Sequence, residues 1–246
     1  MKGTVLILGA TSAIARGTAA AMARAGYSLY LAGRDEQELQ RDAVDLQQRF
    51  GVNVGFGLFD AEQYEQHPVF LEQVTTEMGA LAGVVVAFGY LGAQDKAAVD
   101  FDETLAIINR NYVGAVSILN LCANRMKEAG KGFIVGIASV AGDRGRQSNY
   151  TYGSAKGAFA LYLQGLRNRL ARKGVHVLTV KPGFVDTGMT FGLEGMFLVA
   201  TPRYVGERIA HAVERGRDVL YVPWFWRYIM LIITHIPERI FKRLSL

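Results

Sequence analysis

Short apolar runs alternate with longer helical patterns along the whole chain. The runs are continuous rather than broken by polar residues, which is typical of strands buried on both faces of a parallel sheet. We predict seven such strands, at residues 4–8, 28–32, 52–58, 83–89, 132–138, 175–180 and 218–222. We predict helices up to about residue 25, at about 36–50, 62–78, 102–127 and 149–171, and from Thr201 onward. This alternation predicts one α/β domain.

The composition fits that interpretation and narrows the setting. Half of the 246 residues are hydrophobic, which suits one α/β domain with a large core. The single cysteine, Cys122, excludes an intrachain disulfide, and its apolar surroundings predict a core thiol in a reducing, cytoplasmic compartment. The histidines are scattered without ligand spacing, so we expect no metal site.

The net charge of +5 favours anionic partners such as nucleotide cofactors, phosphates or membrane surfaces. Nucleic acid is not expected, because no cluster of lysines and arginines is interleaved with aromatic residues. The apolar run near the N-terminus is too short for a signal peptide and is followed at once by Gly9, so we interpret it as the first strand.

The segment from Ser139 to Lys156 carries the candidate chemistry. Ser139 follows a buried strand, and Tyr152 and Lys156 are spaced to lie on one face of the next helix. An ammonium beside a phenol favours the phenolate and lowers the phenol pKa, while a nearby hydroxyl can hold a substrate oxygen. The set can give a proton to a carbonyl as a hydride arrives, or remove one in reverse. The alternative is an exposed helix face with no chemistry.

This segment resembles the active site of the short-chain dehydrogenase/reductase family, whose motif is Tyr-x-x-x-Lys with an upstream serine. The turn from Pro182 to Thr187 is similar to the family's Pro-Gly-x-Val-x-Thr turn, and the resemblance covers residues 3–222. It implies a Rossmann-like, doubly wound, parallel seven-stranded sheet in the order 3-2-1-4-5-6-7, with helices on both faces. It also implies a catalytic set of Asn111, Ser139, Tyr152 and Lys156. Asn109 competes with Asn111, but the spacing to Gly114 favours Asn111.

The resemblance implies a dinucleotide cofactor. The turn after the first strand keeps Gly9 of the family's Gly-x-x-x-Gly-x-Gly pattern, but alanines stand at positions 13 and 15. An ordinary turn between strand and helix is the alternative for this segment, and a helix cap is the alternative for Asp60. The implied cofactor-binding residues are Gly9, Thr11, Ser12, Ile14, Arg34, Asp60, Gly89, Tyr152, Lys156, Pro182, Gly183, Val185 and Thr187.

Arg34 follows the second strand, where dinucleotide folds discriminate between cofactors. An arginine there accommodates the 2′-phosphate of NADP, whereas a carboxylate favours NAD. We therefore expect NADP(H) to be preferred over NAD(H). Asp35 fits better as an N-terminal helix residue that opposes the helix dipole.

One region departs from the family pattern, and another follows the matched turn at Pro182 to Thr187. The fourth strand ends Val86-Ala87-Phe88-Gly89 where the family carries Asn-Asn-Ala-Gly, so two bracing side chains are absent. Residues 187–200 are rich in Gly, Met and Phe and predict a mobile lid over an apolar substrate, or else a loosely packed loop. The candidate substrate-binding residues are Arg144, Arg146, Met189 and Phe191.

Residues 223–246 form an amphipathic tail beside the catalytic unit at 1–222. Its apolar core is shorter than the about 20 residues that a spanning helix needs. Both tryptophans stand at one end, and Arg239, Lys242 and Arg243 stand at the other. This pattern predicts peripheral membrane contact through residues 224–246, on the inner face of the membrane, or a helix packed in the interface of a homodimer or homotetramer.

Within the family, the end of the fourth strand, the basic loop after Ser139 and the tail resemble the decaprenylphosphoryl keto-erythropentose reductases. This resemblance implies a carbonyl substrate that is a lipid-phosphate-linked keto sugar. The alternatives are a soluble ketoacyl-thioester or steroid-type reductase and a non-catalytic dinucleotide-sensing regulator. The intact Ser139, Tyr152 and Lys156 set argues against a regulator, because a sensor needs no proton donor.

Overall fold

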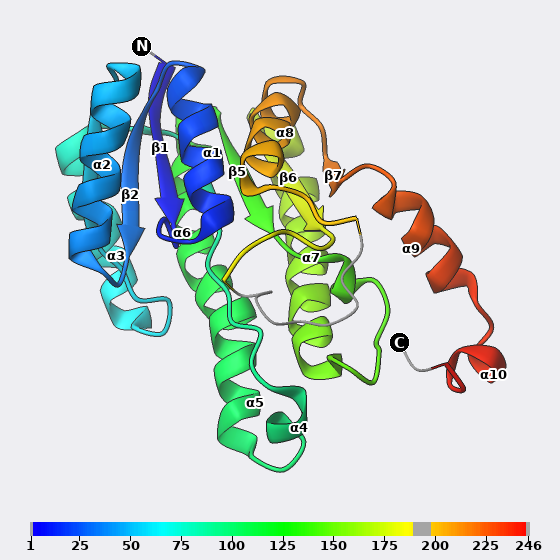
Figure 1. Cartoon of the computed structure of the whole chain (residues 1–246). Helices are drawn as coiled ribbons and strands as arrows, with labels where there is room; N and C mark the ends of the chain where they lie inside the picture. The colour runs from blue at the N-terminus through cyan, green and yellow to red at the C-terminus, as the bar shows by residue number, and fades with distance from the viewer. Residues whose placement is uncertain (1, 189–197, 245–246) are drawn as a thin grey trace.

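The sheet of the molecule confirms the predicted fold. The computed structural model describes residues 2–188 and 198–244. Seven strands lie in the order β3-β2-β1-β4-β5-β6-β7, and each neighbouring pair is parallel (Figure 1). The strands are β1 (Lys2–Leu8), β2 (Tyr27–Gly33), β3 (Val54–Leu58), β4 (Leu81–Val86), β5 (Gly132–Ile137), β6 (Val175–Pro182) and β7 (Val219–Val222).

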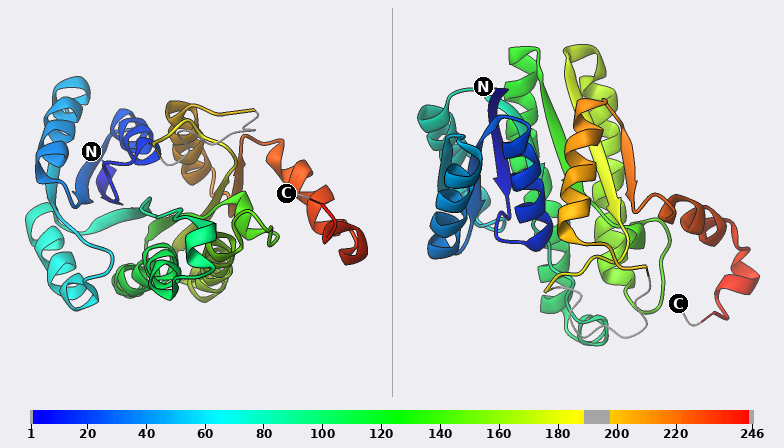
Figure 2. Two further views of the ribbon diagram at one scale, coloured as in Figure 1. Left: turned by 60° about the horizontal axis from the view of Figure 1, so that its bottom comes forward. Right: turned by 45° about the horizontal axis from the view of Figure 1, so that its top comes forward.

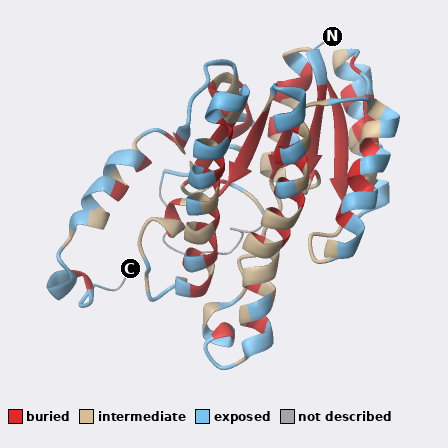
Figure 3. Cartoon of the chain, turned by 180° about the vertical axis from the view of Figure 1, so that it is seen from behind, coloured by how far each residue is buried: buried red, intermediate tan, exposed pale blue. Residues whose placement is uncertain are grey.

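Helices cover both faces of this sheet (Figure 2). One face carries α1 (Ala13–Arg24), α2 (Glu36–Phe50) and α8 (Pro202–Glu214), and the other carries α3 (His67–Met78), α6 (Gly114–Ala129) and α7 (Tyr150–Leu170). Strand β1 shows why the strands read as unbroken apolar runs. Val5 and Ile7 enter one core and Leu6 and Leu8 the other, and all four are fully buried (Figure 3).

The helix predicted at 102–127 is interrupted in its middle. Helix α5 (Phe101–Ile108) joins α6 through a π-helical turn, η2 (Asn109–Val113), which contains Asn111. Single π-helical turns of this kind are frequent at functional sites. By length and composition alone Phe101–Ala129 could cross a membrane. In the protein it is a core helix, since Ile118 and Leu119 are fully buried against the sheet.

Three short helices follow the carboxyl ends of strands: η1 (Tyr64–Gln66) after β3, α4 (Gln94–Ala97) after β4 and η3 (Val140–Gly142) after β5. A fourth, η4 (Ala171–Lys173), joins the end of α7 to the amino end of β6. Of these, η3 follows Ser139 directly, and α4 lies beside the first turn of α7. Both therefore position the start of α7, which carries Tyr152 and Lys156.

The tail is two helices rather than the single amphipathic helix expected. Helix α9 (Trp226–His235) ends before Pro237, and α10 (Glu238–Phe241) begins after it. Proline has no N–H and restricts the residue before it to an extended conformation, which Ile236 adopts. Both helices lie beyond the β7 edge of the sheet, away from the main body (Figure 1). One side of α9 is buried through Trp226 and Met230.

Candidate active site

The carboxyl ends of the central strands border two adjoining cavities. One has a volume of about 440 Å³ and the other of about 220 Å³. The turn after β1 and the segment after β4 line both of them, through Thr11, Ser12, Ala87, Phe88 and Gly89. Open α/β sheets hold ligands at this edge. The shared lining makes the two cavities one elongated site.

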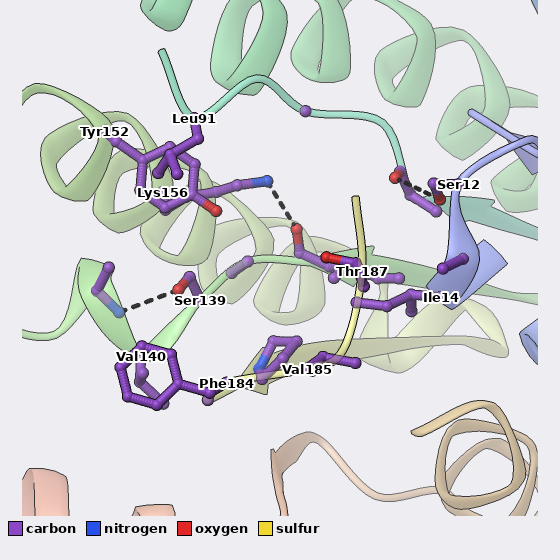
Figure 4. Close-up of a pocket in the computed structure, with 18 of the residues that line it drawn as sticks. Ser12, Ile14, Leu91, Ser139, Val140, Tyr152, Lys156, Phe184, Val185 and Thr187 are labelled. Atoms are coloured by element: carbon purple, nitrogen blue, oxygen red, sulfur yellow. Dashed lines mark hydrogen bonds between the residues drawn. The ribbon is translucent and has the colours of Figure 1, made fainter. Parts of the chain in front are cut away.

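Backbone packing brings Ser139 to Tyr152. The helix η3 lies directly on α7, and glycines make the contact. A Cβ on Gly142 would lie 2.6 Å from the Gly157 nitrogen, and Gly153 makes a similarly close approach. The Ser139 hydroxyl accepts a hydrogen bond from the Ala141 N–H of η3 at 3.1 Å, and this packing brings it into the same cavity as Tyr152. Both side chains lie in the larger cavity with Lys156 (Figure 4).

The phenol of Tyr152 is held in its neutral form. Burial of the hydroxyl raises the pKa of Tyr152 to about 12, and the neighbouring Ser139 hydroxyl opposes that rise only in part. The expectation that Lys156 lowers this pKa is therefore wrong for the protein alone, because desolvation dominates and only the Ser139 hydroxyl opposes it. A protonated phenol is the form that can donate a proton to a carbonyl oxygen.

Lys156 is buried without an acidic partner among the described residues. Its Nζ donates a hydrogen bond to the carbonyl oxygen of Ile137, at 3.0 Å. Desolvation lowers the pKa of Lys156 to about 8. A Cβ on Gly89 would lie 3.2 Å from Nζ, so the glycine leaves the ammonium room at the junction of the two cavities.

Asn111 is the buried asparagine of the π-helical turn, whereas Asn109 is only half-buried. Nδ2 of Asn111 donates to the carbonyl oxygens of Tyr90 and Ile107, at 2.6 and 2.8 Å. Its Oδ1 accepts from the Tyr90 N–H at 3.2 Å. These bonds fix the segment that follows β4. The proton relay that the family implies for Asn111 remains a proposal.

The turn after β1 has the geometry of a phosphate-binding turn. Gly9 has a φ of +76°, and a Cβ there would lie 2.6 Å from the Phe88 nitrogen, so only glycine fits. Ser12 caps α1 by accepting from the Ala15 N–H, and its hydroxyl donates to the carbonyl oxygen of Ala87 at 3.3 Å. The N-terminus of α1 thus faces the cavities, where its N–H groups and dipole favour an anion.

The alanines that replace two family glycines are accommodated in this turn. Ala13 lines the larger cavity, together with Thr11 and Ile14, and Ala15 is fully buried in the core. The bond from Ser12 to Ala87 also braces the end of β4, where the family's asparagines are missing.

The smaller cavity holds the residues expected at the adenosine end. Arg34 and Asp60 both line it, together with Arg110, which is paired with Glu62. Asp35 caps α2 by accepting from the Glu38 N–H at 3.0 Å, as expected. Asp60 accepts from the Glu62 N–H at 2.9 Å within a turn, and this bond caps no helix, since η1 begins at Tyr64. The phosphate-binding turn lies between the two connected cavities, and the smaller one, called the outer cavity below, carries the arginines. This arrangement fits an extended dinucleotide.

The substrate side of the larger cavity has apolar walls that come from distant segments. Pro182, Gly183, Val185 and Thr187 line it as the resemblance implied. Leu91, Val140, Phe184 and Trp226 line it as well, and the sequence did not identify them. Trp226 is 3% exposed and packs edge-on against Phe184, with ring centroids 5.5 Å apart. The tail therefore builds part of the active site.

The two candidate substrate arginines have different surroundings. Arg144 lies outside the cavity lining, where its guanidinium stacks on Phe241 at 3.9 Å and pairs with Glu238 at 2.9 Å. It also donates to carbonyl oxygens at the end of α9, those of Ile233, Thr234 and Ile236. The structure thus gives Arg144 a structural role that the sequence did not predict. Arg146 does line the cavity. Met189 and Phe191 lie outside the described residues.

Comparison with known proteins agrees with this geometry. A family model described as short chain dehydrogenase matches residues 3–194. An uncharacterized oxidoreductase of Mycobacterium tuberculosis is 35% identical over 240 residues, which cover 98% of this chain and 96% of that protein.

Two solved structures share the fold. An actinorhodin polyketide ketoreductase variant with NADPH superposes with a TM-score of 0.82 at 22% identity, covering 90% of this chain and 95% of that one. An NAD+-bound xylitol dehydrogenase has a TM-score of 0.80 at 19% identity, with 90% and 97% covered.

Proposed function

Because the chain belongs to the short-chain dehydrogenase family and is an oxidoreductase, we propose that it is an NADPH-dependent reductase that converts a carbonyl into a secondary alcohol, or the reverse. One observation carries this proposal. Ser139, a protonated Tyr152 and the buried Lys156 converge in one cavity beside a phosphate-binding turn. A regulator without turnover would not need this set.

The side chains have distinct tasks in the reduction. NADPH, when bound, supplies the hydride to the carbonyl carbon. The Ser139 hydroxyl donates a hydrogen bond to the carbonyl oxygen, and Tyr152 transfers its proton to the same oxygen as negative charge develops there. The Lys156 ammonium stabilises the phenolate that Tyr152 becomes.

The preference for NADPH rests on Arg34. It stands at the outer cavity just after β2, and neither Ala32 nor Gly33 offers the carboxylate that favours NAD. The structural relatives include proteins with NADPH and with NAD+, so their fold alone does not select a cofactor.

A lipid-phosphate-linked keto sugar is the substrate that we propose within this function. The resemblance to the decaprenylphosphoryl keto-erythropentose reductases supports it, as do the basic loop and the tail. The second candidate is a ketoacyl-thioester or steroid-type substrate, which the apolar walls formed by Val140, Phe184 and Trp226 favour.

Such a lipid substrate requires the enzyme to reach a bilayer. On α9 and just before it, Trp224, Tyr228 and Ile232 are 67%, 58% and 68% exposed. Two exposed arginines belong to the same tail, Arg227 on α9 and Arg239 on α10. Aromatic and aliphatic side chains beside arginines suit an anionic membrane surface. We therefore propose peripheral binding on the cytoplasmic face. A homodimer or homotetramer that uses this surface is the alternative.

Sedimentation with anionic vesicles tests the membrane proposal. Deleting the tail would be a poor test, because it also removes Trp226 from the active-site wall. The double variant Trp224→Ser/Ile232→Ser removes only exposed side chains, and Val69→Ser, at a 65% exposed position on α3, is its matched control. We expect salt-sensitive binding that the double variant loses and the control keeps. Binding that is absent in the native protein, with an oligomer that the double variant dissociates, would favour the interface instead.

Oxidation of NADPH over a panel of carbonyl compounds tests the reaction itself. The panel should contain a phosphorylated keto sugar, a ketoacyl thioester and a ketosteroid. We expect turnover with at least one compound, and the ranking selects between the two substrate candidates. NADPH binding without turnover on any of the panel, or on an extract of polyprenyl-phosphate sugars, would favour the regulator.

A further inference from the structure

The loop between Ser139 and α7 ends in two side chains that line the catalytic cavity with unsatisfied polar atoms. Nε of Arg146 and Oδ1 of Asn149 are both buried, and neither has a hydrogen-bond partner within residues 2–188 and 198–244. The Asn149 N–H donates to the Arg146 carbonyl oxygen at 3.1 Å, so the two belong to one turn. Buried polar groups in native proteins are nearly always paired, and this pair requires an explanation.

Asn149 is unpaired because another residue performs its usual task. It occupies the N-cap position of α7, where asparagine normally accepts a hydrogen bond from the helix. Here Gln94 of α4 supplies that acceptor, and its Oε1 takes the Thr151 N–H at 2.9 Å. The Asn149 side chain makes no capping bond and remains available to the cavity.

Arg146 forms no ion pair within residues 2–188 and 198–244, and the acidic side chains that bind the neighbouring loop and Lys181 are already engaged. Asp143 accepts from Lys181 at 2.5 Å and from the Tyr221 hydroxyl at 2.8 Å, and Glu238 is paired with Arg144. Desolvation lowers the pKa of Arg146, whose side chain is half-buried and whose Nε is buried without a partner within residues 2–188 and 198–244. Burying an unpaired charge costs free energy, which a bound anion would offset.

We propose that Arg146 and Asn149 form a subsite for a phosphate group and an adjacent hydroxyl of the substrate, which makes the substrate a hydroxylated, phosphorylated carbonyl compound. The guanidinium fork matches two phosphate oxygens, and the amide can pair with a hydroxyl. Tyr152 follows Asn149 within the first turn of α7, so the subsite is next to the proton donor. This inference rests on the reductase function proposed above and specifies its substrate class.

Matched ketones test the subsite. The probes are dihydroxyacetone, its phosphate monoester, and its phosphodiester with a decyl chain. For the native protein we expect kcat/KM for the monoester to exceed that for dihydroxyacetone by about 10- to 100-fold, the range for hydrogen bonds to a charged group. Arg146→Gln should reduce this ratio to near one, and Asn149→Ala should reduce it less. Arg172→Gln, an exposed arginine at the far end of α7, should leave the ratio unchanged.

The chain-bearing phosphodiester separates two sources of phosphate. A higher kcat/KM for the diester than for the monoester would assign the subsite to a lipid headgroup, and the reverse order to a free phosphate ester. A native protein that does not discriminate between phosphorylated and neutral ketones would overturn the inference. A ratio that survives in Arg146→Gln would overturn it too.

A binding measurement keeps the inference separate from the reductase function. Calorimetry with dihydroxyacetone phosphate should show binding to the NADPH-loaded native protein and a loss of at least about tenfold in Arg146→Gln. NADPH binding of the variant checks its fold. Arg146-dependent binding without turnover would leave the subsite standing and remove the reductase proposal. Turnover with neutral ketones and no phosphate binding would support the reductase proposal and overturn the subsite.

Discussion

The nucleotide side and the substrate side of the active site are built in different ways. The nucleotide side uses features that are local in sequence: Gly9 at a positive φ, Ser12 as a helix cap, and Arg34 just after β2. The substrate side assembles side chains from distant segments, with Arg146 in the loop before α7 and Trp226 in the tail. The first arrangement can be deduced from short motifs. The second depends on how the chain folds back on itself.

Lys156 lies where the nucleotide side and the substrate side meet. Of the variants that distinguish the two sides, its removal should have the largest effect on activity. Lys156→Ala should lower kcat by about 10²-fold or more, because the phenolate of Tyr152 loses its neighbouring charge. It should also weaken NADPH binding, since Nζ lies beside Gly89, which lines both cavities. Steady-state kinetics and cofactor titration measure the two effects. A fall in rate with unchanged NADPH affinity would place Lys156 on the substrate side alone.

Arg34 should affect only the nucleotide side. Arg34→Ala removes the cation expected to hold the 2′-phosphate, so the Kd for NADPH should rise by about 10- to 100-fold, while that for NADH changes by less than about twofold. Fluorescence titration with both cofactors measures this, and Arg172→Gln is the matched control. Equal affinity of the native protein for the two cofactors would contradict the assignment.

The smallest expected effect is the contribution of the Lys156 charge to the pH dependence of the unfolding free energy. The pKa of Lys156 is about 8 in the folded protein and 10.5 without perturbation, so between these values the unfolded chain holds the extra proton. Unfolding free energy should therefore rise with pH in this window, and the rise should be smaller in Lys156→Met. Thermal midpoints of both proteins between pH 8 and 10 provide the comparison. Parallel curves would mean that the lysine charge is compensated in the fold.

The sequence was sufficient for the architecture. The parallel strands follow from unbroken apolar runs separated by helices, and β1 shows the reason, since successive residues enter opposite cores. Their order was implied by the family resemblance. The positions of Ser139, Tyr152 and Asp35 follow from a strand end, a helix spacing and a helix cap. Each of these signals is local.

Long-range packing could not be predicted in the same way. Arg144 and Arg146 look equivalent in the sequence, but the fold of the tail gives Arg144 partners at the end of α9 and leaves Arg146 in the cavity. Trp226 carried no active-site signal, because its role depends on α9 packing beside Phe184. The Tyr152 pKa was expected to fall, but burial of its hydroxyl raises it.

The central claim is that Tyr152 is the proton donor, and Tyr152→Phe tests it most directly. The variant keeps the ring and removes only the hydroxyl, so NADPH affinity measured by fluorescence should stay within about twofold of native. With the best carbonyl substrate of the panel, single-turnover oxidation of NADPH should slow by about 10²- to 10⁴-fold, the usual contribution of general acid catalysis. A near-native single-turnover rate in Tyr152→Phe would contradict the assignment of the proton donor.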